Sequence, residues 1–492
     1  GNPPYVRQER FKDRKDDYQK AFPGSYSGTA DLYVYFYERS IKLLEPDGAF
    51  AFITSNKWYR SKYGEKLREW MKRETRLLRV IDFGDAPVFD AIAYPTIVIA
   101  QRRKKAVARI TEDELVRALN WSAGAYEVKE FPEVFARESF VVPQGELKRD
   151  GWQLEVSTKR RLLDRVRAAG VSLGEYVGGR FYNGVKTGLN EPFILSGGER
   201  DTIIQEDPKS VEIIKPFLQG RDVKRWEVKA HDQWIIYIPW HFPLHEDASI
   251  TGASDKAERE FKRQYPAIYK HLQKFKSALE QRDQTETGIR YEWYALQRPR
   301  ADIISDFESP KIFVPTIEDG VEYALDRAGL LGNDKTSVIV CDDPLYVLAV
   351  LNSSISWWVT RQTFSGKQGG FYEFKPMYVG RLPVPAPSSR QLSIVKGAVV
   401  AVLSVTESHL ERFINGLVYE LFFPEDLHAA GIKLFDAAEA VGVGKLAALR
   451  GNALAKAAQD LVTMLKDNGS PLFKHLFNLR ALEVVRIIEE ET

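Results

Sequence analysis

Three short, nearly continuous apolar runs constrain how the first part of the chain can fold. They lie at 49–54, 77–83 and 95–101, and turn-forming residues or loops bound each of them. The segments 31–44 and 63–74, which precede the first two runs, place apolar residues at helical spacing. Apolar strands that alternate with helices are typical of an α/β fold with a mainly parallel sheet.

The connection between the last two runs is too short for a helical crossover, so we predict that these strands pair antiparallel. Three or four strands make only half of a doubly wound sheet, whose ligand crevice normally lies where the strand order reverses. The chain also begins with Gly1 rather than methionine. We therefore expect the biological protein to continue upstream of Gly1. Residues 11–28 show no clean period, and we expect a loop there.

The chain opens on an unusual run, Gly1-Asn2-Pro3-Pro4-Tyr5. Its two prolines fix the backbone near polyproline geometry and offer no N–H, which excludes a helix or an inner strand. The Asn2 side-chain oxygen, the Pro3 carbonyl and the Tyr5 ring suit a planar group that carries an exocyclic amine, such as adenine. An ordinary turn is the competing interpretation, and four residues alone do not decide between the two.

Composition narrows the class of protein. With 492 residues, 44% of them apolar, the chain is long enough for roughly two to four domains, and its formal charge of +2 does not make it a polycation. Its single cysteine, Cys341, cannot form an intrachain disulfide, and its seven histidines show no metal-ligand spacing, so we predict no metal site. No apolar stretch approaches the roughly 20 residues that cross a bilayer, and we expect a cytoplasmic protein without membrane contact.

Three motifs carry a resemblance to a known family: N-P-P-Y at 2–5, D-L-Y-V-Y-F-Y-E-R-S-I-K-L-L-E-P-D-G-A-F-A-F-I-T-S-N-K-W at 31–58, and V-F-D at 88–90. In this order they resemble the gamma-type adenine-N6 DNA methyltransferases that carry a TaqI-like specificity domain. Type IIG restriction–modification proteins and related phage-defence methylases belong to this group. Protein-glutamine methyltransferases share N-P-P-Y but lack the long downstream region.

The resemblance implies that Asn2, Pro3, Pro4 and Tyr5 form the catalytic motif. Asn2 and the Pro3 carbonyl would hold the N6 amine of a flipped adenine and stabilise the positive charge that develops on methylation. Tyr5 would stack on one face of the base, and Phe89 would close the other. Stacking of about 1–3 kcal/mol per base is comparable to the few kcal/mol that unstacking costs. Without the family, Phe89 would be interpreted as core packing at a strand end.

The resemblance also implies S-adenosylmethionine as the methyl donor, yet the family's glycine-containing cofactor loop lies upstream of N-P-P-Y. No glycine-rich loop in this sequence follows a strand and opens a helix in the required way, and Asp31 is the one candidate for a cofactor contact. We therefore predict that this chain binds the cofactor poorly by itself. An upstream polypeptide would carry the cofactor loop and any nuclease.

After a mixed connector at 106–150, residues 151–387 resemble the TaqI-type target-recognition domain, an α+β region that would bind double-stranded DNA. Glycines interleaved with polar residues at 178–195 predict a backbone that approaches phosphates or base edges closely, although a plain β-hairpin fits that segment equally well. The side chains expected at DNA are Lys186, Thr187, Asn190, Arg221, Lys224, Arg225 and Lys367.

Amphipathic segments rich in Ala, Leu, Val and Glu fill residues 388–492 and predict a helical C-terminal subdomain. Glu227 and Lys229 have the E-x-K spacing of metal-dependent nucleases, but Asp222 lies too close to them, and we assign no nuclease here.

The leading hypothesis is a fragment of a sequence-specific DNA adenine-N6 methyltransferase from a restriction–modification or phage-defence system. Residues 1–105 would form the C-terminal half of its Rossmann-like catalytic sheet. The alternative is a DNA-recognition module whose methylase half is incomplete and non-catalytic. A methyltransferase that acts on RNA or protein is a third possibility, against which only the resemblance of residues 151–387 argues.

Overall fold

A computed structural model gives the fold of the protein and describes residues 1–84, 86, 88, 94–111, 113–121, 127–152, 154, 157–229, 232–282 and 290–490. The chain divides into two compact units. The first contains residues 1–165 and 361–372, and the second contains residues 166–360 and 373–492. No helix in the described part of the chain combines the length and the apolar character that a membrane span requires.

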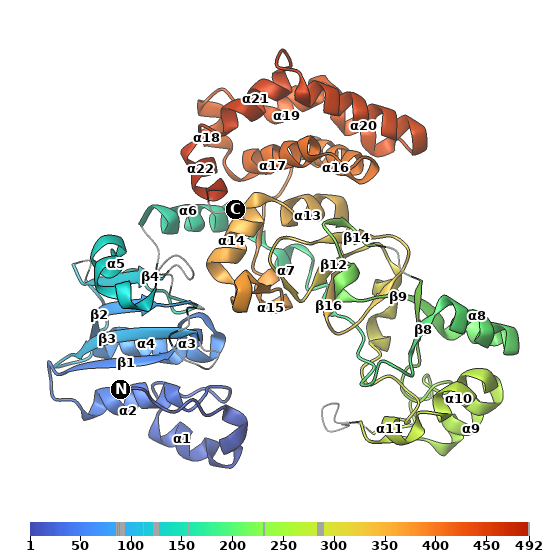
Figure 1. The fold of residues 1–492 in the computed structure, drawn as a ribbon, viewed down its shortest axis with the longest axis horizontal. Coiled ribbons are helices and arrows are strands. Elements are labelled where there is room, and N and C mark those ends of the chain that lie inside the picture. Colours follow the sequence, from blue (N-terminus) through green and yellow to red (C-terminus); the bar gives the residue numbers. More distant parts are fainter. Residues whose placement is uncertain are drawn as a thin grey trace. The chain divides into compact units, whose positions relative to one another are not determined.

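A five-stranded mixed sheet forms the centre of the first unit, with strand order β1-β3-β2-β4-β5 (Figure 1). Its strands are β1 (Ala49–Ser55), β2 (Thr75–Asp82), β3 (Pro95–Arg102), β4 (Leu115–Asn120) and β5 (Phe140–Pro143). β3 runs antiparallel to both β1 and β2, as predicted for the last two apolar runs, whereas β2 and β4 are parallel. The position of β3 between β1 and β2 was not predicted, because the pattern within a strand does not determine its neighbours.

The segment 106–150, expected to be a connector, supplies β4 and β5 of this same sheet. β4 reads L-V-R-A-L-N, with a charged residue in the middle, so its apolar signal is weak. β5 has only four residues. Two strands of this kind are hard to recognise from sequence, and the predicted domain boundaries at 105, 150 and 387 stay a prediction.

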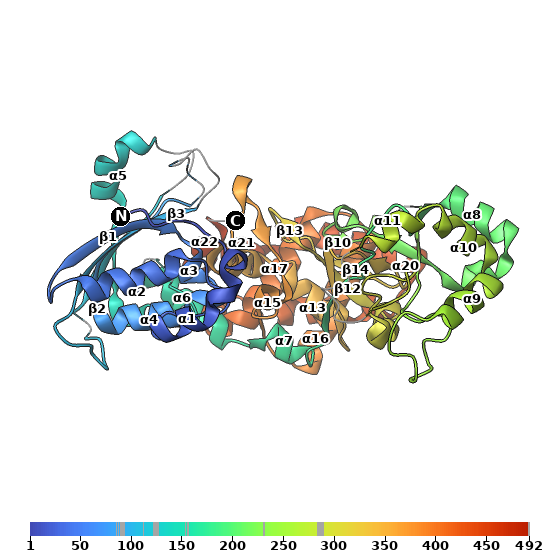
Figure 2. The ribbon, with the colours of Figure 1, turned by 90° about the horizontal axis from the view of Figure 1, so that it is seen from below.

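Both faces of the sheet are covered, which explains why its strands are almost continuously apolar. Val80, Val98 and Ala118 pack in one cluster with α2 and α4, whereas Ile81 and Leu119 pack in a second cluster with α5. Figure 2 shows α2 and α4 together on one side of the strands and α5 on the other. The helices of this unit are α1 (Lys15–Ala21), α2 (Tyr33–Leu43), α3 (Lys57–Arg60), α4 (Glu65–Glu74), α5 (Phe131–Glu138) and most of α6 (Ser157–Ala168).

The segment 11–28 is partly helical, and the expectation of a loop was wrong. Tyr18 on α1 and Phe22, the residue that caps its C-terminal end, place their rings 4.9 and 5.5 Å from the ring of Tyr35 on α2. Contacts of aromatic rings rather than an aliphatic stripe stabilise this helix, so the usual apolar period is absent.

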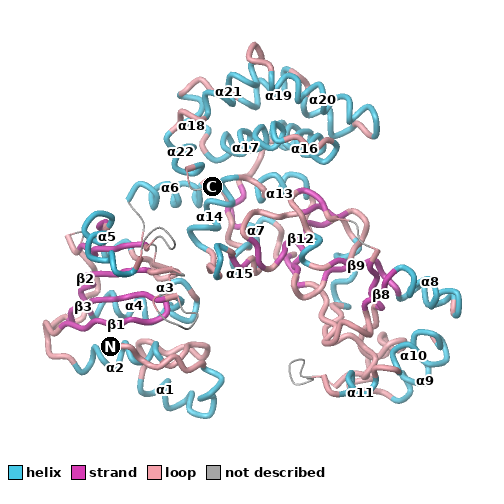
Figure 3. The backbone as a smooth tube through the Cα atoms, viewed as in Figure 1, coloured by secondary structure: helices cyan, strands magenta, loops and turns pink. Residues whose placement is uncertain are grey.

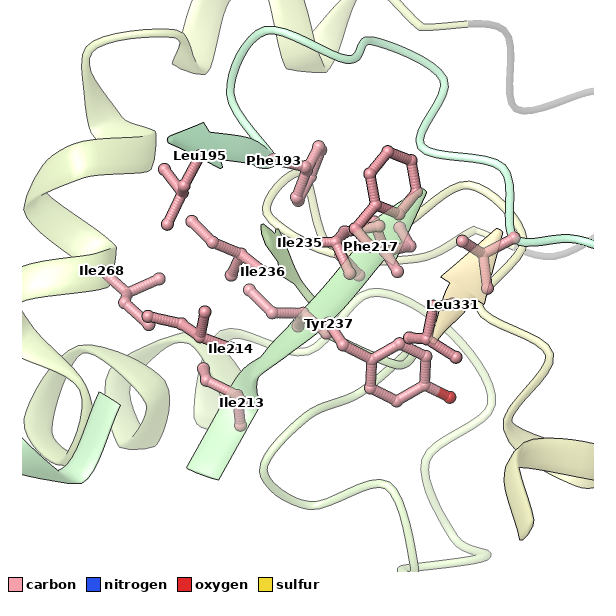
Figure 4. Packing of buried hydrophobic residues seen from close by; sticks show 14 of the residues in the cluster. Phe193, Leu195, Ile213, Ile214, Phe217, Ile235, Ile236, Tyr237, Ile268 and Leu331 are labelled. Carbon is pink, nitrogen blue, oxygen red and sulfur yellow. The ribbon is translucent and has the colours of Figure 1, made fainter. Parts of the chain in front are cut away.

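Two further sheets organise the second unit, in the orders β10-β14-β12-β16-β7 and β15-β9-β11-β8. Apolar residues of the second sheet form a core with the helices beside it, and Figure 4 shows Phe217, Ile235 and Leu331 grouped there. The strands are β7 (Phe181–Asn183), β8 (Ile194–Ser196), β9 (Ile214–Leu218), β10 (Trp226–Glu227), β11 (Gln233–Ile236), β12 (Lys311–Pro315), β14 (Ala324–Asp326), β15 (Leu331–Gly332) and β16 (Thr336–Ile339).

Short helices surround these sheets: α7 (Leu173–Tyr176), α8 (Gly197–Glu206), α9 (Asp255–Gln264), α10 (Pro266–Gln273), α11 (Lys276–Glu280), α12 (Ile304–Glu308), α14 (Ser354–Thr363) and α15 (Pro376–Val379). The helix α13 (Pro344–Leu351) is buried along nearly its whole length, and it packs against β12 and β14 as well as against α16 and α17. It therefore packs between the sheet that contains β12 and β14 and the C-terminal helices.

The C-terminal region is helical, as predicted (Figure 3). Its helices are α16 (Ser389–Ser404), α17 (Ser408–Phe422), α18 (Pro424–Ala429), α19 (Leu434–Ala440), α20 (Gly451–Lys466), α21 (Pro471–Leu479) and α22 (Glu483–Glu489). Mixed α/β sheets followed by helices confirm the predicted fold class in outline.

Candidate functional site

The N-P-P-Y segment leaves the outer edge of β1 near the carboxyl end of that strand. The Gly1 nitrogen donates to the Ala51 carbonyl at 2.6 Å, and the Ile53 N–H donates to the Gly1 carbonyl at 3.0 Å. This alternation is the hydrogen-bond pattern of a parallel ladder. Figure 1 places the N-terminus beside β1 and α2. The carboxyl ends of strands are where α/β sheets bind ligands.

One of the two groups predicted to hold an amine, the Asn2 side chain, is accessible at this edge. The Asn2 side chain is exposed, and none of the described residues hydrogen-bonds to it. Pro3 is buried, and Tyr5 is 44% exposed, with its hydroxyl donating to the Ile53 carbonyl at 3.4 Å. Burial raises the pKa of the Tyr5 phenol, so the ring stays neutral. An exposed acceptor and a half-exposed ring in one short segment suit the binding of a planar base.

Tyr33 of α2 lies against the Tyr5 ring, and tyrosine hydroxyls join α2 to the neighbouring elements. The Tyr5 and Tyr33 ring centroids lie 5.7 Å apart, and the Tyr33 hydroxyl is 2.8 Å from that of Tyr63. One turn later, the Tyr37 hydroxyl is 2.7 Å from Oγ1 of Thr54 near the end of β1. Tyr33 and Tyr37 lie within the motif at 31–58, but the sequence analysis gave them no role. Their i, i+4 spacing just before an apolar strand is a signal that could have identified them.

Asp31 lies at the start of α2, next to this segment. Its Oδ1 accepts the Gln8 N–H at 3.3 Å, and the Val6 carbonyl accepts the Leu32 N–H at 2.9 Å. Burial raises the pKa of Asp31. A single carboxylate can accept a hydrogen bond from one hydroxyl group, but it cannot form a binding site for a whole cofactor. Among the described residues of the first unit, no glycine-rich turn follows a strand and opens a helix, so this unit does not fit S-adenosylmethionine as a whole.

A second polar cluster at the same edge was missed by sequence reasoning. Asp82, the last residue of β2, is buried and accepts from Asn56 Nδ2 at 3.0 Å and from the Gly84 N–H at 2.9 Å. Its other oxygen accepts from the Tyr59 hydroxyl and from Arg60 at 3.2 Å. These residues follow directly after two apolar strands, and that position is the signal that would have identified them.

Phe89, predicted to close the second face of the base, lies outside the described residues. In the sequence, Phe89 lies between β2 and β3. Its stacking role stays a prediction.

Two of the segments predicted to contact DNA meet the same turn of the second unit. The Val185 N–H, next to Lys186, donates to the Gly332 carbonyl at 2.9 Å. Gly220, next to Arg221, packs closely against Lys335: a Cβ atom added to this glycine would lie 3.0 Å from the Lys335 carbonyl oxygen. Asn190 and Arg221 are exposed, whereas Lys186 and Lys224 are half-buried. Lys367 belongs to the first unit.

Thr187 and Arg225 form side-chain contacts within the second unit. Thr187 is buried, and its hydroxyl donates to Asn190 Oδ1 at 2.6 Å. Arg225 donates to the Asn352 carbonyl at 2.7 Å and pairs with Glu411 of α17 at 2.9 Å, and burial lowers its pKa. These contacts give both residues structural roles, and whether they also contact DNA stays a prediction.

Within the described residues, no three His, Cys, Asp or Glu side chains lie close enough together to hold a metal ion.

Two family models match the chain. Residues 1–89 match the Eco57I restriction-modification methylase, and residues 215–384 match the TaqI-like C-terminal specificity domain. The chain is related to the type II restriction–modification methyltransferases. Its first unit contains the methylase match, and its second unit contains nearly all of the specificity match.

Similar proteins carry both parts. The chain is 26% identical over 394 residues to the Type II methyltransferase M.PaeR7I of Pseudomonas aeruginosa, a match that covers 78% of this chain and 64% of that protein. It is 25% identical to M.XhoI of Xanthomonas vasicola, covering 81% of this chain and 71% of that protein. RM.Eco57I of Escherichia coli, a Type II restriction enzyme and methyltransferase, is 24% identical over 78% of this chain and 40% of its own length. The chain therefore spans only part of these relatives.

The fold is shared with a solved structure, that of the Type IIL restriction-modification enzyme MmeI in complex with DNA. That structure matches the whole of this chain and 57% of its own chain, with a TM-score of 0.52 at 14% identity.

Proposed function

We propose that the chain holds and recognises the target of a sequence-specific DNA adenine-N6 methyltransferase of a restriction–modification or phage-defence system. The observation that carries this proposal is the exposed Asn2 side chain in the same short segment as the half-exposed Tyr5 ring, next to β1. The chain around it matches a methylase model at 1–89 and a specificity domain at 215–384. The relatives named above, all methyltransferases, support the same activity.

The chain's own residues would act by electrostatics and positioning. The two hydrogens of the N6 amine would be donated to the Asn2 side-chain oxygen and the Pro3 carbonyl, which stabilise the positive charge that develops on nitrogen. Tyr5 would stack on the base, with Phe89 on the other face. No general base with a shifted pKa is needed for this role.

S-adenosylmethionine would supply the methyl group, and the described residues offer it no cradle. We propose that an upstream polypeptide supplies one and extends the sheet toward a Rossmann-like arrangement. The hydrogen bonds of Gly1 support this proposal, because they show that the outer edge of β1 accepts a backbone in parallel register. Asp31 would then face the cofactor from this chain.

Double-stranded DNA would contact the second unit around the turn at 332–336. Lys186 and Arg221 lie on segments that meet this turn, and Lys224 lies on the same stretch as Arg221. Cations beside a tight, glycine-containing backbone suit a phosphodiester chain.

The experiment that tests the proposal combines this chain with an upstream polypeptide and S-adenosylmethionine, and it measures N6-methyladenine in DNA by mass spectrometry of the nucleosides. Methylated adenine in DNA is the expected product. Methylation of RNA or protein in place of DNA would contradict the proposal.

A DNA-recognition module without catalysis is the second candidate, favoured by the absence of a glycine-rich cofactor loop from the sequence. In that case the chain binds DNA with a steep salt dependence, but no upstream polypeptide restores methyl transfer.

A further inference from the structure

A cavity of about 560 Å³ lies in the second unit, lined by residues from 239–245 and 298–302. Both segments lie within the described ranges of the chain. The volume is in the range of roughly 300–1,000 Å³ that is usual for sites that bind small ligands. Rings, two arginines and one carboxylate form most of the wall, contributed by Trp240, His241, His245, Arg298, Arg300 and Asp302. The function proposed above leaves this cavity without a role.

One part of the wall is the fixed aromatic ring of Trp240. This ring stacks on that of Tyr291, with centroids 5.6 Å apart and planes 13° apart, and its Nε1 donates to the Leu296 carbonyl at 2.9 Å. Because Trp240 lines the cavity, the part of its ring that Tyr291 does not cover can meet a ligand. Every nucleobase has a π-face, so a flat ring of this kind suits a base of any identity.

Arg300 adds a cation whose hydrogen-bonding capacity is not fully used. Its Nε atom is buried and forms no hydrogen bond with any described residue. Asp302, the one carboxylate of the wall, is exposed, and it forms no ion pair with Arg300. A buried donor without an acceptor is costly, and such donors are usually satisfied by a partner, an ordered water or a ligand. A phosphate oxygen is an acceptor that pairs well with a guanidinium.

The backbone of the wall is held in an unusual conformation on both sides. His241 and Arg300 have φ values of 62° and 59°, in the left-handed region that residues other than glycine rarely adopt. Residues held there cluster at ligand sites. The buried Glu292 fixes His241, because its Oε2 accepts the His241 N–H at 2.7 Å and its Oε1 lies 3.0 Å from the His241 Nδ1. The wall is therefore preorganised before a ligand binds.

The cavity adjoins the surface that we propose to contact DNA. The Lys186 N–H donates to the Arg298 carbonyl at 3.1 Å, and the Arg298 N–H donates to the Lys186 carbonyl at 2.9 Å. Val185, next to Lys186, bonds to Gly332 of the turn at 332–336. A DNA strand that contacts this surface therefore runs next to the cavity. A base stacked within a duplex cannot offer its face to a side chain, so a base that enters the cavity must leave the stack.

We propose that this cavity binds one unstacked nucleotide of the bound DNA, with its base on Trp240 and its phosphate at Arg300. An exocyclic amine of the base can donate to Asp302. This inference rests on the proposed function and adds to it a nucleotide site within the segment that matches the specificity domain. The site belongs to the second unit, whereas the N-P-P-Y segment belongs to the first.

The test measures, by fluorescence anisotropy, binding of the whole 492-residue chain to two short DNA duplexes, one fully paired and one with a single unpaired nucleotide. We expect the wild type to bind the second duplex about 10-fold more tightly, because an unpaired nucleotide costs less to unstack. Trp240→Leu and Arg300→Gln should each lose most of this preference, whereas Trp240→Phe keeps an aromatic face and should retain it. The matched controls are Trp234→Leu on β11 and Arg259→Gln on α9, because neither residue lines the cavity.

Tyr5→Ala distinguishes the two candidate sites for the unpaired nucleotide. If the preference disappears in this variant and persists in Trp240→Leu, the nucleotide binds at the N-P-P-Y segment, which overturns this inference and leaves the proposed function intact. A wild-type chain that binds both duplexes equally also overturns it. A wild-type chain that binds neither duplex contradicts the proposed function itself. Thermal unfolding of each variant verifies the fold, and Arg300→Gln, which leaves Trp240 in place, decides the result if Trp240→Leu does not fold.

Discussion

Asn2 takes little part in packing, since its side chain is exposed and none of the described residues bonds to it. Replacing it should therefore separate chemistry from folding. In the chain completed by an upstream polypeptide, we expect Asn2→Ala to lower methyl transfer by on the order of 100-fold or more, as loss of one preorganised polar group does elsewhere. DNA affinity and the unfolding midpoint should stay unchanged.

Formation of N6-methyladenine and fluorescence anisotropy give the two measurements. Asn452→Ala serves as the control, because Asn452 is exposed on α20, a helix of the second unit. A loss of DNA binding in step with activity would count against the clamp.

The ionised form of Asp31 lowers the stability of the folded chain. Its pKa is raised by burial, so the folded state disfavours the ionised form. Below the unfolded-state pKa both states are protonated and the cost is zero. It appears as the pH rises through the unfolded value toward the raised folded one, and it persists at neutral pH.

Asp31→Asn keeps an acceptor for the Gln8 N–H and removes the charge. We therefore expect this variant to be more stable than the wild type at pH 7, with a difference that narrows as the pH falls toward 4. Urea unfolding across this pH range measures it. A difference that does not depend on pH would refute the explanation.

At the scale of elements, Arg225 connects the loop before β10 to the helices α13 and α17. Its guanidinium donates to the carbonyl of Asn352, at the end of α13, and pairs with Glu411 of α17. We expect Arg225→Ala to lower the free energy of unfolding by about 1–3 kcal/mol, because a charged hydrogen bond is lost and its partners are left unpaired.

The neighbouring Lys224 gives the comparison. Lys224→Ala should leave stability within about 0.5 kcal/mol, as surface substitutions usually do. If Lys224 contacts a phosphate, its loss makes the salt slope of DNA binding shallower by about 0.9. If Arg225→Ala left stability unchanged and weakened DNA binding, Arg225 would be a DNA contact and not a structural residue. Urea unfolding and a salt series distinguish these results.

Across the whole molecule, sequence reasoning succeeded where local signals were strong. Long amphipathic helices after residue 388 and the apolar strands β1, β2 and β3 were predictable from their periods. The strands β4 and β5 were not, because they are short and one carries a charge in its middle. The N-P-P-Y clamp was inferred from the chemistry of its residues, and its role stays a prediction. The Asp82 cluster depends on which strand ends meet, and a linear pattern does not contain that information.

The cofactor question belongs to the whole molecule as well. The N-P-P-Y segment lies beside β1, whereas the described residues of the first unit offer no glycine-rich cradle for S-adenosylmethionine. The backbone of Gly1 forms parallel hydrogen bonds with the outer edge of β1. Residues upstream of Gly1 could continue this pairing and add a strand to the sheet at that edge. We therefore expect isothermal titration of S-adenosylmethionine into the 492-residue chain to show no micromolar binding. The same titration with an upstream polypeptide added should show it. Micromolar affinity of the chain alone would contradict the proposal that an upstream polypeptide supplies the cofactor site, because the chain's own residues would then have to form that site.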